Sequence, residues 1–178
     1  MRASFESSTD TELVTLIADR HRHALAELYN RHAGWVLARL RNRCADEGLV
    51  AEALQDTFLA VWNGAARYDA RGSVPGWIWG IAIRRMIGLL RKRRPVPVEA
   101  GQEVSTLVSA EDLVLAGTEH GDLAGALRGL SPELRNVVQA TVLDGLTTRE
   151  AACLLGIPAG TVKTRMMRAR AELRGALT

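Results

Sequence analysis

The stretch LDGLTTREAACLLGIPAGTVKTRMMRARAEL, residues 143–173, predicts two short helices joined by a tight turn. Thr147 and Glu150 have the spacing of a capping box, in which each side chain accepts a hydrogen bond from the other residue's backbone N–H. Gly156 suits the left-handed residue that ends a helix, and Pro158 suits the start of the next one. A helix, a tight turn and a basic second helix form the helix-turn-helix arrangement, which places one helix in the major groove of DNA.

The second of these helices has a packing side and exposed sides. Val162, Met166, Ala169 and Leu173 recur at steps of four, three and four residues, which predicts a buried stripe. The other sides carry donors for base edges and phosphates and an apolar group for a thymine methyl. We expect these DNA contacts from Lys163, Thr164, Arg165, Met167 and Arg168. An ordinary amphipathic helix of a bundle is the alternative, but the capping box, glycine turn and basic face together favour DNA binding.

A second basic segment lies in the first half of the chain. The stretch RGSVPGWIWGIAIRR, residues 71–85, puts two tryptophans and two arginines behind a short loop. Residues 84–94 include six basic and no acidic side chains, whereas residues 95–127 include six acidic side chains and no Lys or Arg. A buried helix would account for the rings alone, whereas a nucleic-acid surface would account for rings and charge. Two basic segments separated by an acidic one predict two polyanion-binding units, with solvated faces that have no partner as the alternative.

The composition narrows the class of protein. Of the 178 residues, 47% are hydrophobic, which is typical of a folded chain. The longest apolar run, WIWGIAI, is too short to span a bilayer, and the amino-terminal MRASFESSTDTE is unlike a signal peptide. We therefore expect no membrane insertion. Cys44 and Cys153 are isolated, which predicts buried thiols in a cytoplasmic protein.

Helical spacing dominates the sequence, and no sustained alternation of β-branched residues predicts a strand. The apolar positions predict one helix from Thr9 through Tyr29, another around residues 36–40, a third over 50–62 and a fourth over 75–93. Residues 95–106, PVPVEAGQEVST, are rich in Pro, Gly and acids and predict a linker. We expect an all-α protein of two small helical domains, 1–94 and 122–178, joined by a flexible acidic linker over 95–121.

Three stretches of the chain resemble a known family. GTVKTRMMRARAEL, residues 160–173, resembles the GTVKSRLxRARxxL stretch of bacterial RNA polymerase sigma factors of the extracytoplasmic-function group. LQDTFLAVW, residues 54–62, resembles their VQETFLAVW. YDARGSVPGWIWGIAIRRMIGLLRKRR, residues 68–94, resembles their YDPRGSxxAWLxxIARNRAIDLLRRRR. The three motifs occur in the family's order, which makes the resemblance specific.

The resemblance implies a function for each domain. In the family, the first domain (sigma region 2) binds the β′ clamp of core RNA polymerase and reads the opened −10 element of promoter DNA. The second domain (sigma region 4) reads the −35 element as duplex and contacts the β flap. Direction of polymerase to promoters and strand opening are the implied activities. An anti-sigma protein is a further candidate partner.

The resemblance also implies a role for individual residues. It assigns core-polymerase contacts to Glu52, Gln55, Asp56 and Leu59. It assigns −10 contacts to Arg67, Tyr68, Asp69, Arg71, Ser73, Trp77, Arg84 and Arg91. To the −35 contacts derived above it adds Arg149 and Thr161.

The chain departs from the family pattern on the helix that follows the −10 loop. It has Gly80 and Gly88 where family members carry polar residues, and Arg84 where they carry Asn. Each glycine inside a helix costs about 1 kcal/mol relative to alanine and offers no side chain to a base. We therefore expect a −10 preference that differs from that of commoner members. Trp79 is expected to pack in the core, whereas Trp77 suits either packing or DNA contact.

Two other classes of protein are the alternatives. The sequence contains no P-loop, dinucleotide-binding glycine motif or nucleophile elbow, so we expect no enzyme, no catalytic residues and no cofactor. His21 and His23 match no metal-ligand spacing, so no metal site is expected. A conventional helix-turn-helix regulator that binds duplex DNA without core polymerase is the second alternative. The stretch LQDTFLAVW and the tryptophan-rich first domain argue against it.

Overall fold

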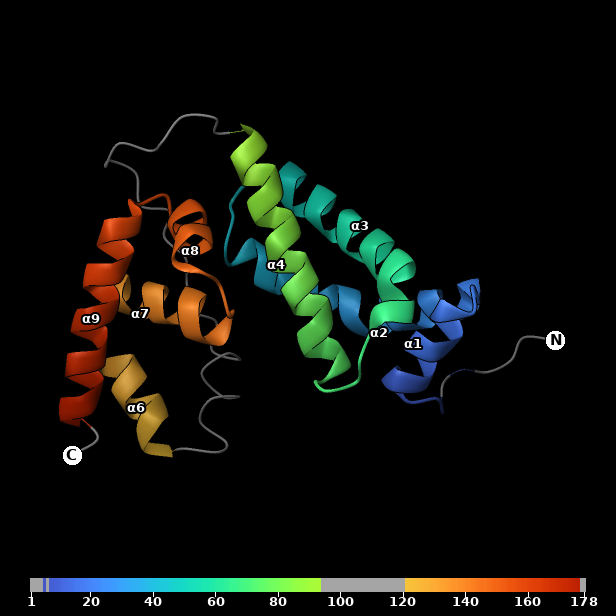
Figure 1. The fold of residues 1–178 in the computed structure, drawn as a ribbon, viewed down its shortest axis with the longest axis horizontal. Coiled ribbons are helices and arrows are strands. Elements are labelled where there is room, and N and C mark those ends of the chain that lie inside the picture. Colours follow the sequence, from blue (N-terminus) through green and yellow to red (C-terminus); the bar gives the residue numbers. More distant parts are fainter. Residues whose placement is uncertain (1–4, 6, 94–120, 177–178) are drawn as a thin grey trace. The chain divides into compact units, whose positions relative to one another are not determined.

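The computed structural model describes residues 5, 7–93 and 121–176, and all regular elements within those ranges are helices (Figure 1). The all-α prediction is therefore confirmed. The chain forms two compact units, one mainly of residues up to 89 and the other mainly of later residues. The predicted linker over 95–121 lies outside the described residues except for Gly121.

The first unit is a bundle of packed helices. Its elements are α1 (Asp10–Ala18), α2 (Arg22–Arg41), α3 (Glu47–Gly64), the 3-10 turn η1 (Ala65–Arg67) and α4 (Val74–Arg93). Thr9 and Glu12 form the predicted capping box at the start of α1. Helix α2 packs against both α1 and α3. Fully buried side chains from all four α-helices form the core: Leu13, Ile17, Leu28, Leu40, Val61, Ile78, Ala82, Ile83 and Met86.

The predicted first two helices have wrong boundaries. The chain breaks after α1, not between Tyr29 and Val36, and α2 then runs unbroken from Arg22 to Arg41. Arg20 causes the break: its φ is +66°, and the His21 N–H donates to the Leu16 carbonyl at 3.0 Å. A left-handed residue that closes the last turn is the usual way to end a helix, but glycine usually fills that position. Because an arginine fills it here, no residue at this position indicates a helix end.

The second unit carries the predicted helix-turn-helix. Its elements are α6 (Gly121–Gly129), α7 (Pro132–Val138), the π-helical segment η2 (Gln139–Leu143), α8 (Thr148–Leu155) and α9 (Ala159–Ala176). Thr147 and Glu150 form the capping box of α8. Gly156 ends α8 with a φ of +67°, as predicted. The core gathers α6, α7 and α9 through Leu127, Leu130, Leu134, Val138 and Ala169.

Candidate nucleic-acid and polymerase interfaces

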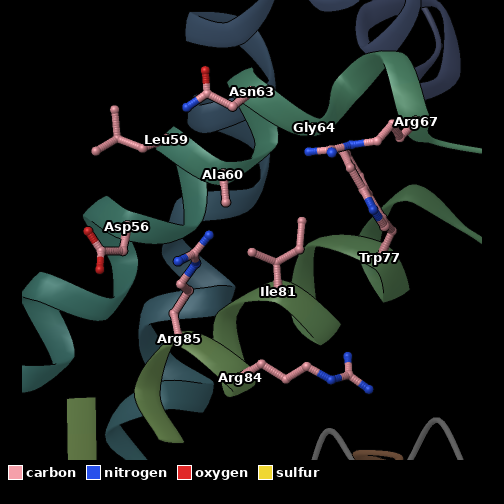
Figure 2. Close-up of a pocket in the computed structure, with 10 residues that line it drawn as sticks. All are labelled: Asp56, Leu59, Ala60, Asn63, Gly64, Arg67, Trp77, Ile81, Arg84 and Arg85. Carbon is pink, nitrogen blue, oxygen red and sulfur yellow. The ribbon is translucent and has the colours of Figure 1, made fainter. Parts of the chain in front are cut away.

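A groove of about 560 Å³ lies between α3 and α4 in the first unit; we call it the α3–α4 groove (Figure 2). Arg67 and Trp77 point toward each other at one end of it, while Arg85 extends toward α3. Arg84 also lines the groove, and Asp56 contributes a carboxylate. Three guanidinium groups against one carboxylate make the lining basic. An aromatic ring beside positive charge suits an unpaired nucleotide, which offers a π face and a phosphate.

The two tryptophans of α4 have different surroundings. Trp79 is 5% exposed, and its ring centroid lies 6.3 Å from that of Trp35. The Arg39 guanidinium carbon lies over both rings, 5.1 Å from the Trp79 centroid and 5.5 Å from that of Trp35. Trp77 is half-buried, lines the α3–α4 groove and has its centroid 5.0 Å from that of Tyr68. Trp79 therefore packs in the core, as predicted, and Trp77 is the ring that the groove exposes.

The loop before α4 is held by its own side chains. The Tyr68 hydroxyl donates to a backbone carbonyl four residues later at 2.6 Å. The backbone N–H of Arg71 donates to the Asp69 carboxylate at 3.2 Å. Ser73 Oγ accepts from the Gly76 N–H at 3.2 Å, so Ser73 caps the first turn of α4. Three predicted −10 residues thus order the loop, while the Arg71 side chain is 89% exposed.

The remaining predicted −10 residues lie on α4. Arg84 is exposed at the α3–α4 groove, whereas Arg91, in the last turn of α4, is exposed but does not line it. The structure adds Arg85 to the groove, a residue that was not among the predicted −10 contacts. Arg85 directly follows the predicted Arg84, and this adjacency is the sequence signal that could have identified it. Half-buried Ile81 also lines the groove and supplies apolar surface between Trp77 and Arg85.

The predicted polymerase-binding residues form a ridge on α3. Glu52, Gln55 and Leu59 are exposed, and Asp56 is half-buried. The ridge separates two grooves: Asp56 lines the α3–α4 groove, and Gln55 lines a second groove of about 840 Å³ between α2 and α3. Leu59 lines both. Glu52 lines neither of the two.

The second groove, which we call the α2–α3 groove, collects exposed apolar side chains. Leu59 is 52% exposed and Tyr29 is 42% exposed, and they are the two exposed large hydrophobic residues in the described part of the first unit. Tyr29 packs edge-on against Phe58 with ring centroids 4.7 Å apart. Exposed apolar residues gathered at one groove suit contact with another protein. Tyr29 was missed because its helical spacing predicted core packing.

Helix α9 has the packing stripe that the sequence predicts. Val162 and Ala169 are buried, and Met166 and Leu173 pack against the core of the second unit. The predicted −35 residues then occupy different surroundings. Lys163 and Met167 line a groove of about 740 Å³ with Arg170 and Arg174, which were not predicted. Arg165 and Arg168 do not line it, and neither do Arg149, Thr161 and Thr164.

The spacing of the groove residues could have revealed the two missed arginines. Lys163, Met167, Arg170 and Arg174 recur at steps of four, three and four, parallel to the packing stripe and one residue after it. Thr147, at the start of α8, lines the same groove. A helix start beside basic side chains is suited to phosphate binding.

The described residues contain no group of three or more His, Cys, Asp and Glu side chains that could hold a metal ion. Within the same ranges, the helices are too short or too polar to cross a membrane.

Comparisons with known proteins match both units. The family model Sigma-70 region 2 matches residues 28–96, and Sigma-70, region 4 matches residues 120–173. The ECF RNA polymerase sigma factor SigM of Mycobacterium tuberculosis is 31% identical over 169 residues, covering 93% of this chain and 83% of SigM. The ECF RNA polymerase sigma factor SigE of Mycolicibacterium smegmatis is 34% identical over 154 residues, covering 83% of this chain and 59% of SigE. A solved structure of CnrH in complex with the cytosolic domain of CnrY is 27% identical, covers 94% of this chain and 96% of CnrH, and has a TM-score of 0.46.

Proposed function

The chain belongs to the extracytoplasmic-function sigma factors of the sigma-70 family, and we propose from this that it binds core RNA polymerase, directs it to promoters and promotes strand opening. The observation that carries the proposal is the match of regions 2 and 4 to the two halves of the chain, in that order. The alternative of a conventional regulator is not supported, because region 2 has no place in a protein that acts without polymerase. We expect the chain to act in the cytoplasm and to have no catalytic activity.

We assign core-polymerase binding to the ridge of α3 and the α2–α3 groove beside it. The ridge combines the Asp56 carboxylate, the Gln55 amide and the apolar Leu59, and the groove adds Tyr29. A partner that buries this surface would gain apolar area from Leu59 and Tyr29 and charge attraction from Asp56. Basic groups on the partner, beside apolar ones, complement such a surface.

We assign the opened −10 strand to the α3–α4 groove and the loop next to it. An unpaired base can stack on an aromatic ring, which is worth about 1–3 kcal/mol per base. Trp77 and Tyr68 offer such rings, and Arg67, Arg71 and Arg84 supply positive charge for the phosphates. The loop's own hydrogen bonds hold the Tyr68 ring and the start of α4 in place before DNA arrives, which lowers the entropy cost of binding.

We assign the −35 duplex to the exposed sides of α9 and to the start of α8. Lys163, Arg168 and Arg170 are exposed on α9, and Arg149 is exposed in the first turn of α8. Contacts to base edges give sequence preference, and contacts to phosphates hold the register. We also propose that the second unit contacts the β flap of core polymerase and that an anti-sigma protein binds the chain.

The direct test is transcription with core polymerase from genomic DNA fragments. The expected result is a set of transcripts with defined start sites that needs both the chain and core polymerase. Sequence-specific binding of duplex DNA by the chain alone, with no transcript when core is added, would leave the regulator as the correct function.

A further inference from the structure

The two glycines that distinguish α4 from the family pattern have different surroundings. Both are half-buried within the helix. A Cβ atom added at Gly88 would have open space around it, with nothing within 4 Å. A Cβ atom added at Gly80 would lie 3.1 Å from Nη1 of Arg84. Only Gly80 therefore makes room for a neighbouring side chain.

The space over Gly80 is filled by the guanidinium of Arg84. Nη1 of Arg84 donates a hydrogen bond to the Gly80 carbonyl oxygen at 3.0 Å. Arg84 thus folds back along α4 by one turn, toward the end of the α3–α4 groove that holds Trp77. A guanidinium carries five donors and stays charged when it donates, so the bond to Gly80 orients the group and keeps its charge.

A residue with a side chain at position 80 would disturb this arrangement. An alanine Cβ at 3.1 Å is closer than ordinary van der Waals contact, so the guanidinium would have to shift. A longer side chain would occupy the space itself and drive the guanidinium away from the carbonyl. Glycine at position 80 therefore lowers the intrinsic stability of the helix, and it leaves the space that the Arg84 guanidinium occupies.

We propose that Gly80 is a positioning residue that holds Arg84 against the backbone phosphates of the unpaired promoter strand. The proposal rests on the assignment of the −10 strand to this groove. In it, Trp77 and Tyr68 stack the bases, and Arg84 neutralises a phosphate at the same end of the groove. Gly88 has no such role.

The test compares matched substitutions at the two glycines in holoenzyme assembled from core polymerase and the full chain. The variants are Gly80→Ala, Gly80→Leu, Gly88→Ala and Gly88→Leu, with Arg84→Ala as the reference for complete loss. Binding to a single-stranded oligonucleotide carrying the non-template −10 sequence of a promoter mapped with wild type is measured over a range of salt concentrations. Failure of wild type to initiate from any fragment would refute the proposed function, and this result is separate from the comparison among variants.

Arg84→Ala and Gly80→Leu are expected to weaken oligonucleotide binding at least about tenfold, the lower end of the range for a lost charged hydrogen bond. Both should also reduce the slope of log K against log salt by about 0.7, the value for one phosphate contact on a single strand. Gly80→Ala should lie between these variants and wild type, and the Gly88 variants should match wild type. A purely structural effect of residue 80 would not change the salt slope.

The second arm repeats Gly80→Ala in the Arg84→Ala background. There it should leave DNA binding unchanged and raise the thermal midpoint, because alanine favours a helix over glycine. The proposal is overturned if the Gly80 variants keep the wild-type salt slope. It is equally overturned if Gly80→Ala weakens binding as much without Arg84 as with it.

Discussion

Truncation of Leu59 to alanine should weaken binding to core polymerase without unfolding the chain. Leu59 is 52% exposed on the ridge between the two grooves of the first unit. Complete burial of a leucine side chain is worth about 1.5–3 kcal/mol, so burial of its exposed half on binding is worth about 1 kcal/mol or slightly more. At 1.4 kcal/mol per factor of ten, the expected loss is roughly five- to tenfold in Kd.

The assay is a titration of core polymerase with labelled chain in the absence of DNA, with thermal unfolding to establish that each variant is folded. Met167→Ala is the matched control, because Met167 is 67% exposed, apolar and in the second unit, at the proposed duplex-contacting helix. It should bind core as wild type does. If Leu59→Ala binds core as tightly as wild type, the ridge of α3 is not the polymerase contact.

Three further outcomes concern the fold and its pH dependence. Gly156→Ala should lower the free energy of unfolding in urea by about 1–2 kcal/mol, because the φ of +67° at this residue is left-handed. Gly160 lies within α9, so Gly160→Ala should leave that free energy unchanged or raise it. Equal effects of the two substitutions would refute the assignment of Gly156 as the helix cap. Trp79→Ala should cost about 3–5 kcal/mol, because the ring is 5% exposed, and a loss under 1 kcal/mol would show that it does not support the core. Two hydrogen bonds from Thr9, the stronger from its backbone N–H and the other from its hydroxyl, lower the pKa of Glu12 below its ordinary value of 4.5. The charged carboxylate therefore stabilises the fold above pH 4.5, and this stability is lost as the pH falls through the folded-state pKa. Glu12→Gln should therefore destabilise at pH 7 and not at pH 2 in urea unfolding, and an equal effect at both values would contradict this.

Much of the fold follows from local sequence patterns because the residues that begin and end these helices act locally. The capping boxes at Thr9 and Thr147 and the left-handed Gly156 are each determined by residues within one turn. The stripe from Val162 to Leu173 repeats at helical spacing and packs as that spacing predicts. The helix break at Arg20 could not be predicted from the sequence, because the left-handed conformation is usual for glycine and unusual for arginine.

The grooves could be predicted only in part because a groove depends on how two helices meet. The resemblance named Arg67, Trp77 and Arg84, yet it could not show that Arg85 joins them. Tyr29 had the spacing of a core residue, and only packing between α2 and α3 leaves it exposed. The difference between Gly80 and Gly88 depends on where the Arg84 side chain lies, and no sequence pattern contains that information.

The most direct measurement of the central claim is promoter opening by the assembled holoenzyme, followed by permanganate reactivity of unpaired thymines. On a fragment that yields a mapped transcript, we expect reactive thymines in the −10 region only when core polymerase and the chain are both present. We also expect that the Trp77→Ala chain still binds core but leaves those thymines unreactive. Opening without the chain, or specific duplex binding by the chain with no opening in the presence of core, would show that the chain does not act as a sigma factor.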